Sequence, residues 1–349
     1  MLYEQLSEVP VHIEAFELSR HERDTSSGFT RTTTGISMSG DGETGRGEDV
    51  TYDTEAHDAL HDASPNLPIT GTYTLDEFSD RLDDIDLFHG TVPTQSVFRN
   101  YRRWGFESAA LDLALRQRDT NLADHLAREY RPVRFVVSTR LEDPPTGDRI
   151  LEWLDRDPEI EFKLDPTSEW TPAVIERLAS TDAVRVLDLK GQYHDTIVDQ
   201  PADVELYENV MRRFPDAIVE DPDLTDETLP IFEREPQRVS WDYPIRSVET
   251  IKSLPWAPAW LNIKPSRFGS IQALFDTIDY CRTQGIRMYG GGQFELDVGR
   301  EHLHALASLF YPEAPNDVAP SGYNDPTPGD DLPTSPRGPP SEPRGLSWS

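Results

Sequence analysis

Lysine is nearly absent from this chain. Of its 33 basic residues only four are lysine (Lys163, Lys190, Lys252 and Lys264), and 64 acidic residues leave a formal net charge of −31. Nucleic acids and anionic membranes both need a basic footprint, so the composition argues against either as a partner. The acids are spread along the whole chain, which suits high salt, where repulsion between surface charges is screened. This pattern indicates a halophilic source.

Cysteine and long apolar runs are also scarce. The single Cys281 excludes an intramolecular disulfide, which fits a reducing cytoplasm. Residues 1–16 lack the basic region and apolar stretch of a signal peptide. No apolar run approaches the roughly 18 residues of a membrane-spanning helix. We therefore expect a cytoplasmic protein.

From about residue 133 onward, short apolar segments rich in β-branched residues alternate with amphipathic stretches. This alternation predicts βαβ units and a parallel sheet. Strands are expected at 133–138, 160–164, 183–189, 217–220, 238–242, 260–264 and 286–291, with a possible eighth near 316–322. Their number favours an α/β fold of the modified TIM type, a (β/α)7β barrel. An open doubly wound sheet is the alternative.

The first 130 residues predict a separate α+β domain. Residues 30–39 have the pattern of a strand, and residues 105–130 have helical periodicity. Residues 17–28 and 40–71 are polar and are expected to include mobile loops. The Pro-rich C-terminal end predicts an extended or disordered tail. The expected divisions are an N-terminal domain over 1–130, a barrel over 131–324 and the tail over 325–349.

The ends of the expected strands carry ionisable side chains. In chain order they are Lys163, Asp188, Glu220, Asp242 and Lys264. Because chemistry in β/α barrels sits at the carboxyl ends of the strands, these side chains can converge on one mouth. Three carboxylates suit Mg²⁺, which would stabilise negative charge developing on a substrate carboxylate. A lysine on each side could move a proton at the neighbouring carbon.

A structural explanation competes with this metal site. In so acidic a chain, an Asp or Glu at a strand end is more often a helix N-cap than a ligand. However, three of the four lysines lie at or near strand ends: Lys163, Lys190 and Lys264. Selection for an acidic surface would remove lysines that only need to be solvated. The lysines that stay therefore favour a chemical role.

The stretch from Leu261 to Leu309 resembles the enolase superfamily, in its muconate-lactonizing branch. The nearest likeness is to the o-succinylbenzoate synthase and N-acylamino-acid racemase group. Lys264 lies in an N-I-K-P-x-R-x-G context, and a G-G-x-x-E-x-x-x-G-R segment places Glu295 and Arg300 on family positions. "VEDP" is similar to the fourth-strand E-x-P, "TTTGISMSGDGETGRGE" to the capping-domain hairpin, and "FESAALDLALRQRD" to the capping-domain helix.

The resemblance implies a capping domain, a modified barrel, bound Mg²⁺ and an enzyme of the lyase or isomerase type. Such enzymes remove a proton α to a carboxylate and form an enediolate, ahead of racemisation, epimerisation, cycloisomerisation or dehydration. Lys163 and Lys264 would be acid and base on opposite faces of a small carboxylate substrate. The candidate substrate-binding residues are Lys190, Glu295, Arg267 and Glu161. The oligomeric state stays open, and a homo-oligomer is possible.

The second strand departs from the family's Lys-x-Lys, and two registers are open. If Lys163 is the first lysine, Asp165 replaces the second, which is usually the base. If "EFKLDP" aligns with K-x-K-I-E-P, Lys163 is the base and Glu161 replaces the first lysine. We prefer the second register, because an acid–proline pair follows and the step of 25 residues to Asp188 is the more usual. Lys190 would then supply the missing charge through a Glu161–Lys190 pair on neighbouring strands.

Two arginines and a glycine-rich stretch also bear on the expected site. Arg267 and Arg300 could bind a second carboxylate, or could pack on the surface. The "YGGGQ" stretch (289–293) lacks a nucleotide-binding context, so its glycines are expected to let the backbone pass close to the substrate. A different functional class is a barrel that keeps the metal site and binds a carboxylate ligand without turning it over.

Overall fold

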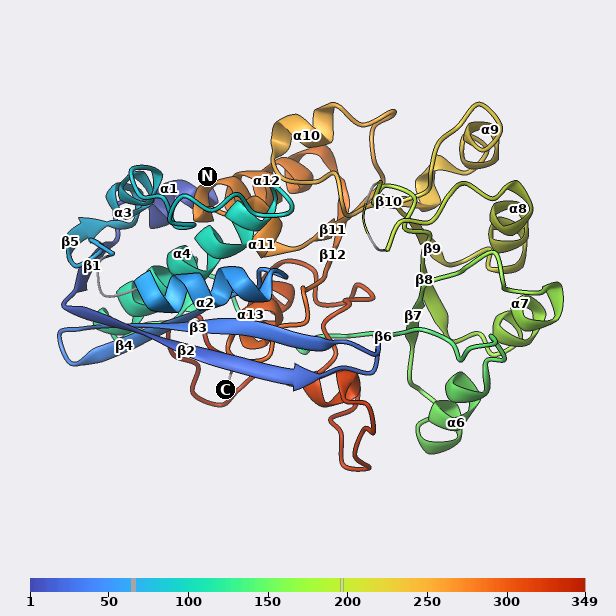
Figure 1. Cartoon of the computed structure of the whole chain (residues 1–349), viewed down its shortest axis with the longest axis horizontal. Helices are drawn as coiled ribbons and strands as arrows, with labels where there is room; N and C mark the ends of the chain where they lie inside the picture. The colour runs from blue at the N-terminus through green and yellow to red at the C-terminus, as the bar shows by residue number, and fades with distance from the viewer. Residues whose placement is uncertain (64–66, 195, 197, 349) are drawn as a thin grey trace.

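The computed structural model describes residues 1–63, 67–194, 196 and 198–348. In the N-terminal domain, a three-stranded antiparallel sheet (β2-β3-β4) and the antiparallel pair β1–β5 accompany the helices (Figure 1). The elements are α1 (Leu2–Leu6), β1 (Pro10–Ile13), β2 (Ala15–Asp24), β3 (Thr30–Gly40), β4 (Glu43–Asp49), α2 (Thr54–Ala63), β5 (Gly71–Thr74), α3 (Leu75–Asp83), α4 (Phe98–Gln117) and α5 (Leu122–His125).

Much of the region expected to be loop in this domain is regular structure. Residues 15–24 form β2, and 43–49 form β4, which lies against α4. The glycines of β4 permit this contact: a Cβ on Gly45 would lie 2.1 Å from the Leu113 nitrogen, and one on Gly47 2.0 Å from the Gly105 oxygen. The strand β4 was not predicted, because its glycines serve close packing of a strand on a helix; residues 64–66 of the expected loop region lie outside the described residues. The strand expected at 30–39 is confirmed by β3.

The second half of the chain is a parallel barrel. Seven strands lie side by side in the order β12-β11-β10-β9-β8-β7-β6, with helices outside them. The strands are β6 (Val137–Thr139), β7 (Phe162–Leu164), β8 (Val184–Asp188), β9 (Ile218–Glu220), β10 (Val239–Trp241), β11 (Trp260–Ile263) and β12 (Arg287–Gly290). The helices are α6 (Asp148–Arg156), α7 (Pro172–Ala179), α8 (Val204–Arg213), α9 (Leu229–Phe232), α10 (Val248–Lys252), α11 (Pro265–Phe268), α12 (Ile271–Gln284) and α13 (Gly299–Phe310).

The barrel is closed by a short segment in the place of an eighth strand. Asn316 forms a parallel bridge with Phe135, and Asp317 forms one with Gly291. The possible eighth strand at 316–322 therefore shrinks to two bridging residues. The predicted fold class, a capping domain with a TIM-like barrel, is confirmed, and the open-sheet alternative is excluded by these bridges.

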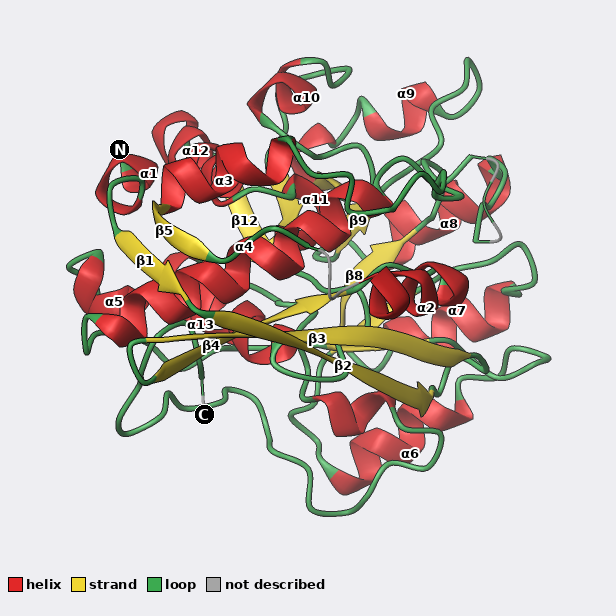
Figure 2. Cartoon of the chain, turned by 60° about the vertical axis from the view of Figure 1, so that its left-hand side comes forward, coloured by secondary structure: helices red, strands yellow, loops and turns green. Residues whose placement is uncertain are grey.

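The C-terminal segment lacks long regular elements but is anchored. The Gly345 nitrogen donates to the Thr120 oxygen at 2.9 Å, and the Arg337 nitrogen donates to Val133 at 2.8 Å. Trp348 is buried. Figure 2 shows the chain returning to the side of the molecule that carries α5 and β4. The tail is thus extended, as predicted, but its end belongs to the packed interior.

Candidate metal centre and barrel mouth

Three fully buried carboxylates meet at one end of the barrel. Asp188 ends β8, Glu220 ends β9 and Asp242 follows β10. One oxygen from each lies within 4.8 Å of the others. Asp188 and Glu220 are level in the sheet register, so successive parallel strands present their last side chains at the same height. The structure brings these three predicted residues together.

Two lysines lie on opposite sides of this carboxylate triad. Lys163 Nζ lies 2.6 Å from Glu220 Oε1 and 3.2 Å from Asp188 Oδ2. Lys264 Nζ lies 2.8 Å from Asp242 Oδ2. Burial alone would lower the pKa of Lys163, but Glu220 and Asp188 outweigh it and raise the pKa well above its ordinary value. Lys163 therefore adds a positive charge to the buried triad.

The carboxylates of the triad differ in their affinity for protons. Burial, reinforced by the negative charge of Asp188, raises the pKa of Glu220 well above its ordinary value. Burial also acts to raise the pKa of Asp188, but Lys190 and Lys163 outweigh it and hold that pKa low. A divalent cation would favour the ionised form of all three groups.

Asp242 is held by Arg267, which the sequence marked as a site candidate, and by Asp221 and Tyr193, which it did not. The Asp242 nitrogen donates to Asp221 Oδ1 at 2.9 Å, which fixes the backbone of Asp242 at the mouth. Tyr193 donates its hydroxyl hydrogen to Asp242 Oδ2 at 2.8 Å. Arg267 Nε lies 3.1 Å from Asp242 Oδ1. Burial acts to raise the pKa of Asp242, but the cations Arg267 and Lys264 outweigh it and keep the pKa low.

The space around Lys264 depends on a glycine after β12. A Cβ on Gly291 would lie 2.8 Å from Lys264 Cε and 2.5 Å from Asn262 Oδ1. Asn262 in turn donates its amide hydrogen to Glu220 Oε2 at 3.2 Å. The glycine-rich stretch was predicted to let the backbone approach the substrate. In the structure, Gly291 makes room for two side chains of the site.

The predicted Glu161–Lys190 pair is wrong. Glu161 precedes β7 and is bound by Arg134 at 2.6 Å and Arg185 at 2.5 Å, both toward the amino end of the strands. Lys190 contacts Asp188 instead and lies 3.7 Å from Asp165. The pair fails because Glu161 lies at the far end of its strand from the mouth. For the same reason Glu161 is away from any ligand at the triad.

The sheet register also bears on the two alignments of the second strand. Lys163 is level with Val186, and Leu164 is level with Leu187, after a register shift between Phe162 and Lys163. Asp165 is thus the next residue toward the mouth, at the height of Asp188. Lys163 reaches the triad from one layer below. Lys163 is thus the residue of β7 whose charged group contacts the triad, and the choice between the two alignments stays a prediction.

Glu295 is placed beside the triad rather than in it. Its Oε1 accepts from the Gln293 nitrogen at 2.6 Å, and its Oε2 lies 3.2 Å from Arg300. Sequence reasoning also missed Asp317, whose Oδ2 lies 3.4 Å from Lys163 Nζ. The only sequence signal for Asp317 was its place in the possible eighth strand.

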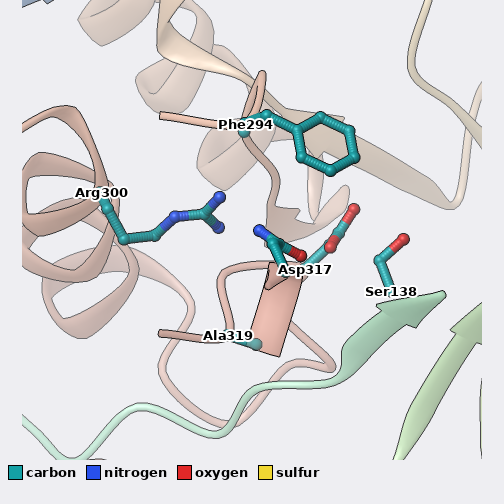
Figure 3. A pocket seen from close by; sticks show the side chains of 7 residues that line it. Ser138, Phe294, Arg300, Asp317 and Ala319 are labelled. Carbon is teal, nitrogen blue, oxygen red and sulfur yellow. The ribbon is translucent and has the colours of Figure 1, made fainter. Parts of the chain in front are cut away.

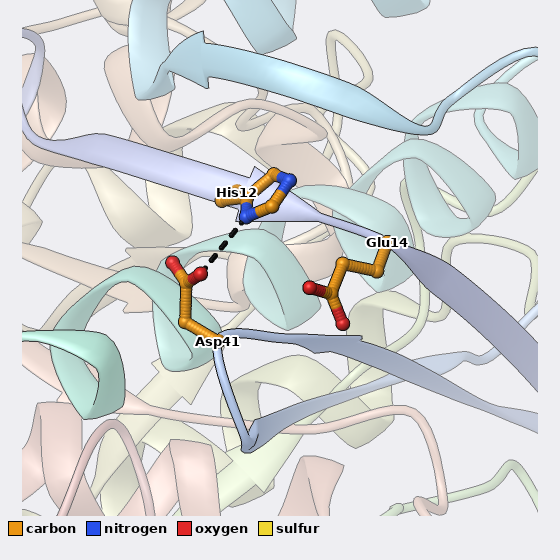
Figure 4. Close-up of side chains that lie close together, drawn as sticks. All are labelled: His12, Glu14 and Asp41. Carbon is orange, nitrogen blue, oxygen red and sulfur yellow. Dashed lines mark hydrogen bonds and ion pairs between the residues drawn. The ribbon is translucent and has the colours of Figure 1, made fainter.

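A second cluster lies on the surface of the capping domain. His12, Glu14 and Asp41 bring one imidazole and two carboxylates together (Figure 4). His12 Nδ1 lies 3.0 Å from Asp41 Oδ1, and all three side chains are partly or fully exposed. An ordinary surface ion pair accounts for this cluster, so we assign it no chemistry.

The buried triad fits a divalent cation such as Mg²⁺. It offers hard oxygen ligands, which Mg²⁺ prefers. Asp242 Oδ1 is buried and, within the described part of the chain, accepts no hydrogen bond, although Arg267 lies beside it. A cation between the carboxylates would satisfy that oxygen. Asp188, Glu220 and Asp242 are therefore the residues that would hold the metal.

Solved structures with this fold belong to the enolase superfamily. A protein named for the mandelate racemase and muconate-lactonizing enzymes, from Roseovarius nubinhibens ISM and solved with magnesium, aligns with a TM-score of 0.72 at 17% identity. The alignment covers 97% of this chain and 96% of that protein. Muconate lactonizing enzyme from Pseudomonas fluorescens, complexed with muconolactone, aligns at 0.70 and 18% identity, over 97% and 96%. An enolase superfamily member from Listeria innocua Clip11262 aligns at 0.68 and 18%, over 89% and 86%.

Sequence comparison identifies the family directly. No curated protein matches the chain. None of the helices in the described ranges combines the length and apolar character needed to cross a membrane. The N-terminal domain of a family described as a domain of unknown function, DUF8230, matches residues 4–125, and its C-terminal domain matches residues 129–325. The chain therefore belongs to the DUF8230 family and has the capping domain and barrel fold of the enolase superfamily.

Proposed function

We propose that this protein is a Mg²⁺-dependent enzyme that removes the proton α to a substrate carboxylate through an enediolate intermediate. One observation carries the proposal: a buried triad of strand-end carboxylates has a lysine on each side. The chain would act on a small carboxylate, as a lyase or an isomerase. Within the resembled group, the reaction that we propose first is like that of o-succinylbenzoate synthase or of a racemase.

Each group has a separate part in the proposed mechanism. Asp188, Glu220 and Asp242 would hold the metal, which supplies Lewis-acid stabilisation of the charged substrate carboxylate when bound. Lys163 and Lys264 contact opposite members of the triad, so they would face the α-carbon from two sides. One would take the proton and the other could return one, a step that positioned acid–base groups accelerate by about 10²–10⁴-fold.

The second strand has one lysine where the resembled family has two, so the chemistry of this chain can differ from that of the family there. Asp165 stands at the height of Asp188, and the side chain of Lys190 enters the same region. Lys190 and Arg267 are proposed to face the substrate as cations near its carboxylate. Glu295 would contact the substrate from the loop after β12.

Exchange of α-protons for deuterium tests the proposal. Purified protein in high salt is incubated in D₂O with Mg²⁺ and a panel of carboxylates, and exchange is followed by NMR. We expect exchange on at least one carboxylate, its loss in EDTA, and its loss in Lys264→Ala and Lys163→Ala. Lys252→Ala is the matched control, because Lys252 ends the outer helix α10. Intact metal binding without exchange on any carboxylate would contradict the proposal.

A non-catalytic barrel that binds a metal and a carboxylate is the second candidate. The altered second strand favours it, since this chain has one lysine there where the resembled family has two. This candidate predicts carboxylate binding that depends on Mg²⁺, with no isotope exchange. We also propose that the protein is cytoplasmic, comes from a halophilic source and can form a homo-oligomer. Activity that rises with KCl concentration would support the halophilic source.

A further inference from the structure

A small pocket opens at the barrel mouth beside the carboxylate triad. It lies between the end of β6, the loop after β12 and the start of α13 (Figure 3). Its lining residues are Ser138, Gly292, Phe294, Arg300, Asp317, Ala319 and Asn324. Asp317 also contacts Lys163 Nζ at 3.4 Å. A ligand held at the triad would therefore have this pocket within reach of its far end.

Arg300 lines this pocket, and its guanidinium has an N–H group without a hydrogen-bond acceptor in the described ranges. The side chain is only 8% exposed, and Figure 3 shows its guanidinium pointing across the pocket toward Asp317 and Ser138. An ion pair joins its NH2 to Glu295 at 3.2 Å, and its Nε makes no hydrogen bond to any of the residues that the structure describes. A guanidinium carries five N–H donors that match a carboxylate in two-point contact. A buried N–H without an acceptor is costly, so an oxyanion in the pocket would be favoured.

The capping domain fixes Arg300 in place. The Gly299 nitrogen, at the start of α13, donates to Glu48 Oε2 at 2.9 Å. Arg31 Nε donates to the Gln293 oxygen at 3.2 Å, in the loop just before the helix. Two strands of the capping domain, β3 and β4, thus hold the backbone beside the guanidinium. A preorganised donor loses little freedom when it binds a ligand.

One wall of the pocket is aromatic. Phe294 has a φ of 56°, a left-handed conformation that a bulky residue rarely adopts, and its ring meets Phe29 edge-on at 5.4 Å. Phe29 comes from the turn of the capping-domain hairpin β2–β3. Phe294 gives one side of the pocket an apolar surface, which lowers the local dielectric and strengthens a charge contact beside it.

We infer that Arg300 binds a second carboxylate of the substrate, so that the substrate class of this protein is the dicarboxylates. The inference rests on the proposed function, since it assumes that the first carboxylate lies at the triad. The pocket's other charge, the Asp317 carboxylate, lies 3.4 Å from Lys163 Nζ, which offsets part of its negative charge. Glu295 pairs with Arg300 through one nitrogen, which leaves the remaining donors for the ligand.

Binding of matched acids tests this assignment. The Mg²⁺-loaded protein is titrated calorimetrically in high salt with succinate, glutarate and adipate, and with butyrate, valerate and hexanoate of equal length. We expect at least one dicarboxylate to bind about tenfold or more tighter than its partner, as a charge-assisted hydrogen bond provides. Arg300→Met should remove this preference and leave monocarboxylate affinity within about twofold. Equal affinities in the wild type, or an unchanged preference in the variant, would overturn the assignment.

Further variants separate binding from folding. Arg300→Lys keeps the charge but loses the two-point contact, so the preference for a dicarboxylate over its monocarboxylate partner should fall severalfold. If Arg300→Met does not fold, an unchanged preference in Arg300→Lys decides against the assignment. Arg287→Met is the control, because Arg287 begins β12 at the opposite end of the barrel. Metal and monocarboxylate binding without a dicarboxylate preference rejects this inference alone. Absence of metal and carboxylate binding rejects the proposed function with it.

Discussion

Lys163 Nζ lies 2.6 Å from Oε1 of Glu220, between that carboxylate and Asp188. All three side chains are buried almost completely. The ammonium thus offsets negative charge in the same space that a divalent cation would enter. We therefore expect both Lys163 and a bound metal ion to stabilise the folded chain by offsetting the negative charge of the triad.

Replacing Lys163 by methionine tests this sharing. Removing one partner of a buried ion pair costs about 3–5 kcal/mol, so the metal-free variant should lose stability of that order. A ligand that binds only the folded protein raises its stability with concentration, and Mn²⁺ should restore more stability to the variant than to the wild type. Denaturation in EDTA and in Mn²⁺ measures both quantities. Lys252→Met is the control, and an equal metal effect in wild type and Lys163→Met would count against the idea.

Gly291→Ala should disable the site while leaving the fold intact. The added Cβ would lie 2.8 Å from Lys264 Cε and 2.5 Å from Asn262 Oδ1, so both side chains must move. A displacement of about 1 Å can cost about 10²-fold in rate. The deuterium-exchange assay measures the loss. Gly329→Ala is the matched control, because no atom lies within 4 Å of its added Cβ; equal rates in both variants would contradict the role of Gly291.

Glu48 should make stability depend on pH. Burial, with some help from Glu295, raises its pKa to about 7, above the ordinary value of 4.5. Because the folded chain then holds a proton that the unfolded chain has lost, stability should fall as pH rises from 4.5 to 7, by up to about 3 kcal/mol.

The variant Glu48→Gln should lack this part of the slope. The difference in unfolding free energy between wild type and variant should therefore be larger at pH 5 than at pH 8, in urea titrations at fixed salt. Glu43→Gln, at the other end of β4, is the control. Parallel stability curves for wild type and Glu48→Gln would show that Glu48 does not titrate in this range.

The C-terminal Trp348 should contribute to the stability of the whole chain. Its side chain is 2% exposed, and its ring lies 5.5 Å from that of Tyr130 and 6.0 Å from that of His304. Trp348→Ala should cost about 3–5 kcal/mol of unfolding free energy, as for other buried aromatic residues. Chemical denaturation measures the loss, and Val92→Ala, at an 84% exposed position, should change little. A loss below about 1 kcal/mol would mean that the tail end is not packed in solution.

The local sequence pattern was sufficient to predict the barrel. The alternation of short apolar strands with amphipathic helices depends on neighbouring residues, and it predicted β7 to β12 within a few positions. The carboxyl ends of parallel strands must meet at one edge, so Asp188, Glu220 and Asp242 could be expected together before any coordinates. The strand β4 was not predicted, because Gly45 and Gly47 serve contact with α4, which lies far along the chain.

Partner choice among charged side chains was decided only by tertiary structure. Glu161 is bound by Arg134 and Arg185 rather than Lys190, because the register of β7 puts it at the far end of the barrel. Asp317 and Arg300 come to the mouth from separate segments. Charge and strand period are properties of neighbouring residues and can be read from sequence. Which opposite charges lie within 4 Å depends on register and closure, which are set by packing over the whole domain.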